Sequence, residues 1–177
     1  PTIRSRCQRL DLEEPPAELP PNWRDQLLAV LDGPPIQGPA AAMAAAAGLS
    51  ALLNEIKTAA EAAIREETRE EEESGLEESD ATVSALVSSR YRESRGLLVM
   101  GMLHWYRDLL ALRSGADASV VFYRDRLESL RRRAQSLTLA QALDNIEAVE
   151  EMGRQLGRSL NETNLLSYWL DRLRGGA

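Results

Sequence analysis

The residues of this chain that could do chemistry are few. His104 is the only histidine and Cys7 the only cysteine. Carboxylates gather in residues 66–78, but their spacing is not the Asp-x-Asp-x-Asx-Gly pattern of a calcium loop. The chain has no phosphate-binding glycine loop and no Gly-x-Ser-x-Gly nucleophile motif. The sequence therefore predicts no metal site, no cofactor and no enzyme activity of this chain by itself.

These features also have structural interpretations. His104 stands beside Trp105 in a long apolar helical pattern, where a lone histidine is typical of a packed or partly exposed core position. The run 66–78 is typical of a solvated helix face, and we expect it to be solvent-exposed and dispensable for assembly. A group of arginines could contact nucleic acid, or could form a solvated face that offsets the negative end of a helix dipole; it comprises Arg124, Arg126, Arg131, Arg132 and Arg133. We favour the second interpretation, since the net charge of −7 opposes DNA binding by this chain.

The N-terminal segment differs from the rest. Residues 1–8 read Pro-Thr-Ile-Arg-Ser-Arg-Cys-Gln, without an initiator methionine, and resemble the middle of a domain. We therefore expect the chain to be a fragment of a longer protein. Arg4 and Arg6 could simply make structural ion pairs, or Arg6 could have a functional role.

This segment resembles the Ser-Arg-Cys motif that ends the ATPase-type domain in clamp-loader AAA+ proteins. The resemblance implies that Arg6 is an arginine finger, with Ser5 and Cys7 as its motif neighbours. A planar guanidinium in this role offsets the charge that develops on the γ-phosphate of ATP bound in a neighbouring subunit. The motif occurs in delta-prime and gamma/tau subunits, and we prefer the delta-prime type.

The C-terminal end carries a second resemblance. Residues 160–166, running into Trp169, Leu170 and Leu173, resemble the last collar helix of delta-prime subunits. Residues 12–36 depart from the family, because they are short and proline-rich and lack the Gly-Ser-x-Gly-x-Ala stretch of the usual three-helix lid.

The elements that would position these residues are helices, and we predict an all-α fold. Aromatic residues make up only 5% of the chain, so the core must be built from Leu, Ala, Val and Ile. Apolar positions at helical spacing and capping residues predict helices over 22–31, 39–64, 82–112, 118–134 and 139–156, and a last helix capped by Ser159 or Asn161. The helix from residue 39 should project into water or fray over 65–73, and only residues 7–12 allow a strand.

We predict three regions. Residues 1–12 are the end of an AAA+ domain, 13–38 are a proline-rich linker or reduced lid with one short helix, and 39–177 are a helical collar bundle. Apolar side chains that could anchor an interface are Trp105, Leu109, Leu165, Trp169 and Leu173.

The resemblance implies a non-catalytic subunit that assembles with gamma/tau and delta subunits. It would meet the sliding clamp and DNA only through the assembled complex. The single cysteine, the absence of a signal peptide and the lack of an apolar run near 18 residues predict a cytoplasmic protein with no membrane contact. The alternatives are an oligomerisation domain of another AAA+ DNA-maintenance protein, a free-standing helical adaptor, or a helical enzyme that uses the carboxylate run.

Overall fold

The prediction of an all-α fold is confirmed. The computed structural model describes residues 18–73, 80–158 and 161–173, and over these residues it contains helices and no strand. Six α-helices and two short 3-10 turns follow one another: α1 (Pro21–Leu31), α2 (Gly38–Glu73), α3 (Asp80–Arg113), η1 (Ala118–Val120), η2 (Arg124–Arg126), α4 (Leu127–Ser136), α5 (Leu139–Leu156) and α6 (Glu162–Leu170). The expected remnant of an AAA+ domain, residues 1–12, lies outside the described residues.

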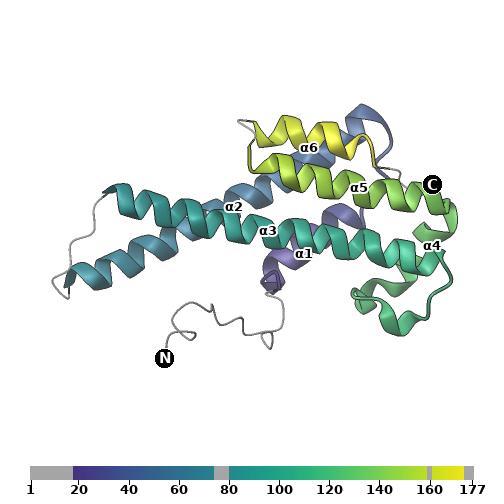
Figure 1. The fold of residues 1–177 in the computed structure, drawn as a ribbon, viewed down its shortest axis with the longest axis horizontal. Helices are drawn as coiled ribbons and strands as arrows, with labels where there is room; N and C mark the ends of the chain where they lie inside the picture. Colours follow the sequence, from purple (N-terminus) through teal and green to yellow (C-terminus); the bar gives the residue numbers. More distant parts are fainter. Residues whose placement is uncertain (1–17, 74–79, 159–160, 174–177) are drawn as a thin grey trace, which may run out of the picture.

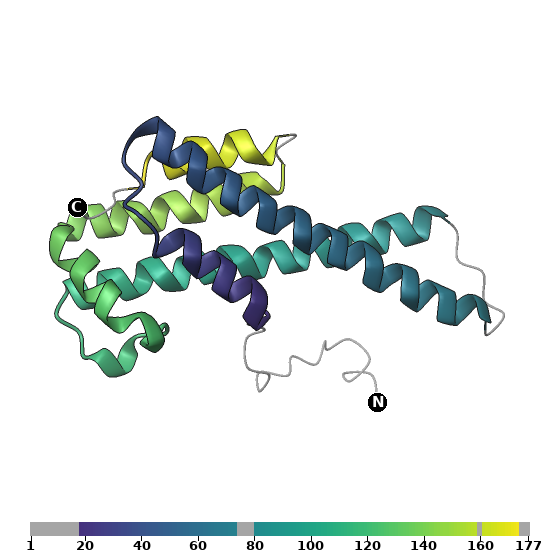
Figure 2. The same ribbon diagram turned by 180° about the vertical axis from the view of Figure 1, so that it is seen from behind.

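Four helices close into a bundle. α2 packs on α3, α3 on α5, α5 on α6, and α6 returns to α2. Figure 1 shows α3 and α5 side by side, and in Figure 2, the view from behind, α2 and α1 lie in front of them. α1 lies against α2 and α3, and α4 packs at the C-terminal end of α3. One continuous apolar core therefore joins all six helices.

α2 supplies one side of this core. Its buried positions start at Ala42 and Ala46, continue through Leu49 and Leu53, and end at Ile64, at the 3–4 spacing of one helical face. Gly38–Arg69 is also long and apolar enough, by length and composition alone, to cross a membrane, with a mean hydropathy of 1.2 in its window. Of that window 33% is buried inside the protein. The burial matches an amphipathic core helix.

The short helix predicted over residues 22–31 is present as α1, and Pro20, not Asn22, is its N-cap. Pro20 occupies the N-cap position without a side-chain hydrogen bond, and Pro21 is the first helical residue. A proline suits this place because its fixed φ is helical and its missing N–H has no partner there anyway. Leu27 and Leu28 are fully buried in the common core, so residues 21–31 belong to the bundle.

The predicted single helix over 118–134 is wrong, because the chain forms η1, η2 and then α4. The Asp117 side chain accepts a hydrogen bond from the Ser119 amide at 2.8 Å, which closes η1. The amides of Phe122 and Tyr123 donate to the carboxylate of Asp108 and not to carbonyls one turn earlier. A helix cannot run through two residues whose amide hydrogens are taken elsewhere.

α5 starts at the residue predicted from its apolar spacing, and α6 is capped by Asn161, one of the two predicted caps. Thr138 and Gln141 form a reciprocal capping box at the start of α5, which spans the predicted 139–156. The side chain of Asn161 accepts from the Asn164 amide at 3.0 Å and caps α6. Leu173 follows α6 and is still buried.

The paired ends of α2 and α3 extend beyond the other helices as a two-helix arm (Figures 1 and 2). Among residues 38–69 of α2, whose burial is described, the last buried one is Ile64, and the first buried residue of α3 is Leu98. Within the arm Glu67 and Arg90 form an ion pair of 3.1 Å. The helix of α2 thus continues past its apolar stripe, as a projecting segment, to Glu73.

Candidate functional site

The residues that the sequence singled out for chemistry, Ser5, Arg6 and Cys7, lie outside the described residues. His104 is described and stands on α3, half-buried. In the described ranges no three His, Cys, Asp or Glu side chains are grouped as metal ligands. The candidate site therefore belongs to the surfaces and cavities of the bundle.

The five predicted interface anchors lie in or against the protein's own core. Trp105 is 1% exposed, and Leu109 and Leu173 are each 3% exposed. Leu165 and Trp169 are partly buried against the same core, and the Trp169 indole N–H donates to Gln155 Oε1 at 3.1 Å. In this fold the side chains of Trp105, Leu109 and Leu173 have almost no exposed surface that a partner could contact.

Other apolar side chains do reach the surface. Large hydrophobic residues that are more than a third exposed are Met43, Leu86, Met100, Val120, Phe122, Leu139, Leu143 and Tyr168. Leu139 and Leu143 lie one turn apart on α5 and are 50% and 47% exposed. Met100 and Phe122 are 46% and 38% exposed and border a cavity, which is the candidate site.

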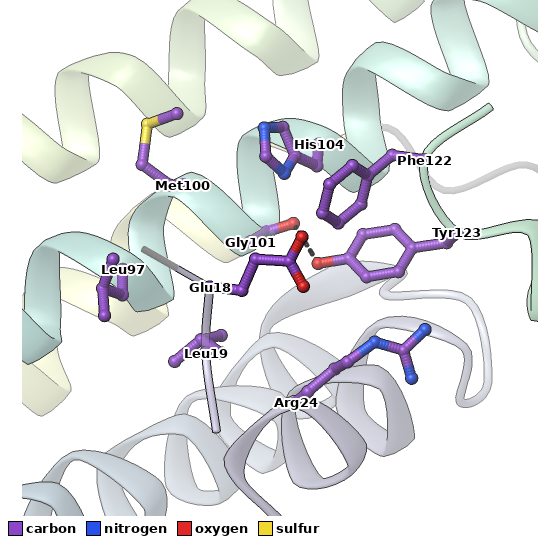
Figure 3. A pocket seen from close by; sticks show the side chains of 9 residues that line it. All are labelled: Glu18, Leu19, Arg24, Leu97, Met100, Gly101, His104, Phe122 and Tyr123. Carbon is purple, nitrogen blue, oxygen red and sulfur yellow. Dashed lines mark hydrogen bonds between the residues drawn. The ribbon is translucent and has the colours of Figure 1, made fainter. Parts of the chain in front are cut away.

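The cavity lies between α3, the start of α1 and the segment after η1 (Figure 3). It has a volume of about 160 Å³ and a mainly apolar lining. Its lining residues are Glu18, Leu19, Arg24, Leu97, Met100, Gly101, His104, Phe122 and Tyr123. In Figure 3 His104 and Phe122 lie together on one side and Leu19 and Arg24 lie on the other. The Glu18 side chain points between them, toward Gly101 and the Tyr123 hydroxyl.

Asp108 sets the position of the two aromatic residues of this site. Its side chain is 0% exposed, and its two carboxylate oxygens accept from the Phe122 amide at 2.9 Å and the Tyr123 amide at 2.8 Å. A buried carboxylate must be compensated in this way because desolvation of an unpaired charge is costly. The bonds fix the chain so that the Phe122 ring lies 4.0 Å from His104 and the Tyr123 ring points inward.

Tyr123 and Gly101 form the floor. The Tyr123 hydroxyl donates to the Gly101 carbonyl oxygen at 3.0 Å, shown as a dashed line in Figure 3. A Cβ at Gly101 would come within 2.7 Å of Leu27 Cδ2 and 3.0 Å of Leu19 Cδ1. Glycine therefore leaves room for the side chains of Leu27 and Leu19 to pack on α3, whereas a Cβ at Gly96 would have nothing within 4 Å. Burial raises the pKa of Tyr123 to about 12.

Arg24 closes one side of the cavity. Its guanidinium lies 5.2 Å from the centre of the Tyr123 ring, and its Nη2 is 2.5 Å from Asp125 Oδ1. The hydrogen bond raises the pKa of Arg24 and lowers that of Asp125. The charge of Arg24 is thus already matched within the protein.

His104 is the titratable group on the opposite side. Burial lowers its pKa from the usual value, the positive charge of Arg107 lowers it further, and the carboxylates of Asp108 and Glu18 act in the other direction. The imidazole is therefore neutral near pH 7. A neutral ring packed at a tilt against Phe122 makes this side of the cavity suited to apolar groups.

The geometry can hold one apolar group against aromatic rings, with charged residues at the rim. Sequence reasoning missed this site because three segments far apart in the chain build it. One signal was present: Asp108 falls three residues after Trp105 on the apolar stripe of α3, where a carboxylate is unexpected. A charged residue on such a stripe is rarely buried unless the fold supplies a partner for it.

No protein-family model, curated protein or solved structure matches this chain. The resemblance to clamp-loader subunits therefore rests on the residues quoted for it.

Proposed function

We propose that this chain is the C-terminal assembly part of a bacterial clamp-loader subunit of the delta-prime type. The observation that carries the proposal is the segment 1–8, with Ser5, Arg6 and Cys7, followed by a purely helical bundle in the described residues. In this function the bundle is a collar that holds the subunit among gamma/tau and delta subunits in the cytoplasm. The sliding clamp and DNA are met through the assembled complex.

Arg6 is proposed as the arginine finger toward ATP in an adjacent subunit. It lies twelve residues before Glu18, where the described bundle begins. A chain of that length spans at most about 40 Å when extended. Arg6 is therefore tethered within about 40 Å of the bundle.

The exposed leucines of α5 support an assembly function better than the buried anchors do. Leu139 and Leu143 present adjacent apolar side chains on the surface of the bundle, where a neighbouring helix would bury them. Complete burial of one leucine side chain contributes about 1.5–3 kcal/mol. We place the contact with the next subunit on this part of α5.

The test starts with the mass of the chain from light scattering after gel filtration, alone and mixed with the motor and delta subunits. A stoichiometric mixed complex is expected, and the double variant Leu139→Ser/Leu143→Ser should weaken it. In the wild-type complex Arg6→Lys should lower ATP hydrolysis at the site that Arg6 serves by roughly 10³-fold. The matched variant Arg4→Lys should have little effect.

Two outcomes would count against the proposal. If the chain elutes unchanged in the presence of folded partners, a free-standing helical adaptor explains it better. If the complex forms but Arg6→Lys and Arg4→Lys hydrolyse ATP equally fast, Arg6 is not the finger.

A further inference from the structure

The cavity beside α3 holds a carboxylate within its apolar and aromatic lining. Figure 3 shows the Glu18 side chain pointing into the cavity, toward Gly101 and the Tyr123 hydroxyl. The negative charge of Glu18 helps to raise the pKa of Tyr123 and also acts on the pKa of His104, so it lies close to both side chains. In residues 18–73, 80–158 and 161–173 no side chain forms an ion pair with Glu18.

The guanidinium that lines the cavity does not balance this charge. Arg24 Nη2 lies 2.5 Å from Asp125 Oδ1, so the charge of Arg24 is matched by another carboxylate. Figure 3 shows the guanidinium extending along the Tyr123 ring and not toward the Glu18 carboxylate. Within the described part of the chain the cavity therefore keeps one negative charge without an ion-pair partner.

Hydrogen-bond acceptors outnumber donors at this end of the cavity. The Tyr123 hydroxyl gives its hydrogen to the Gly101 carbonyl oxygen at 3.0 Å, and the Glu18 carboxylate lies beside this pair in Figure 3. The hydroxyl oxygen can still accept a hydrogen bond, and an ionised carboxylate can only accept. A ligand that satisfies both groups must bring its own donor hydrogens, and a positive charge to balance the carboxylate.

The aromatic walls suit a small apolar group. The Phe122 and Tyr123 rings meet edge to face with centroids 4.9 Å apart, and the His104 ring lies 4.0 Å from Phe122. The cavity volume of about 160 Å³ is close to the ~150 Å³ of an apolar cavity that holds benzene. Aromatic faces also attract a cation through the quadrupole of the ring. One ring-sized apolar body with a cationic end thus fits the cavity.

We propose that this cavity binds a small organic ammonium ion, a primary amine on a benzene-sized apolar body. The apolar body lies against Phe122 and His104, and the ammonium group donates to the Glu18 carboxylate and the Tyr123 hydroxyl oxygen. Charge complementarity to Glu18 selects this ligand over a neutral molecule of the same shape. The site goes beyond the proposed function and does not depend on it, because binding is measured on this chain alone and assembly is measured with partner subunits.

Benzylamine, which is protonated near neutral pH, is the probe, and benzyl alcohol is its neutral counterpart. Phe122 is the only phenylalanine and His104 the only histidine, so isotope labelling of these two residue types gives NMR ring signals from the cavity alone. Both rings should shift saturably when benzylamine is added to the full chain, with a dissociation constant on the order of millimolar or below.

Glu18→Gln keeps the size of the side chain and removes its charge. It should weaken benzylammonium binding roughly three- to tenfold and leave benzyl alcohol binding unchanged. The matched control is Glu93→Gln, an exposed carboxylate on α3 that does not line the cavity, which should change neither affinity.

Three results would each overturn the proposal. The first is the absence of a saturable shift of either ring in the millimolar range. The second is equal affinity of the wild type for benzylammonium and benzyl alcohol, which would make the cavity an apolar one in which Glu18 has no part. The third is equal affinity of Glu18→Gln and Glu93→Gln for benzylammonium.

Discussion

The sharpest test of the fold concerns Asp108. Its carboxylate is completely buried and accepts hydrogen bonds from two backbone amides, Phe122 at 2.9 Å and Tyr123 at 2.8 Å. Asp108→Ala removes both acceptors and leaves two amide donors without a partner. Each hydrogen bond to a charged group contributes about 1.5–3 kcal/mol. Because the Phe122 amide is only part-buried and can recover some solvation, we expect a total loss of about 3–5 kcal/mol.

Urea unfolding followed by circular dichroism at the helical band measures this loss as a shift of the midpoint at constant slope. Asp108→Asn keeps the shape but replaces one acceptor oxygen with a donor, so it should also destabilise the protein. The control is Asp144→Ala on the exposed face of α5, which should change stability by less than about 0.5 kcal/mol. A loss below about 1 kcal/mol for Asp108→Ala would refute the reasoning, since it would mean that the two amides find other partners.

Two further predictions concern the same region. Gly101→Ala should destabilise the protein by up to about 2 kcal/mol in urea unfolding, because overpacking against buried Leu27 costs about 1–3 kcal/mol and the helix-propensity gain offsets up to about 1 kcal/mol of it. Gly96→Ala should only gain, by up to about 1 kcal/mol, and equal effects of the two changes would contradict the packing of Leu27 on Gly101. The pKa of Tyr123 is about 12 in the folded protein and about 10 in the unfolded chain, so between these two pH values the unfolded state ionises first. The stability of the fold is therefore retained below about pH 10 and falls as the pH rises toward 12. Unfolding measured at about pH 9 and about pH 11.5 should show a smaller alkaline loss in Tyr123→Phe than in the wild type, and identical losses would argue against the burial of its hydroxyl.

Much of the helix layout could be predicted from the sequence. The ranges of α5 and most of α3 follow from apolar positions repeated every three or four residues, and the cap of α6 follows from Asn161. These signals are local, since spacing and capping depend on residues within one or two turns.

The segment from 118 to 126 could not be predicted in this way. Its local pattern favours a helix, but the acceptor that overrides it, Asp108, lies 14 and 15 residues earlier in the chain. The cavity is non-local for the same reason, because α1, α3 and the 122–123 segment meet only in the fold. The sequence also shows Trp105 and Leu109 as apolar without telling whether a partner or the chain's own helices bury them.

The projecting arm has a consequence for how this protein can vary between species. The described burial of α2 ends at Ile64, and on α3 the contacts with the bundle begin at Tyr91 and Arg95, which bind Glu162 of α6. Whole turns can therefore be inserted or deleted in the distal part without disturbing the core, provided that both helices change together. Seven residues in each helix add two turns, about 10 Å, and restore the same pairing face. The arm is thus a spacer whose length evolution can adjust independently of the domain that carries it.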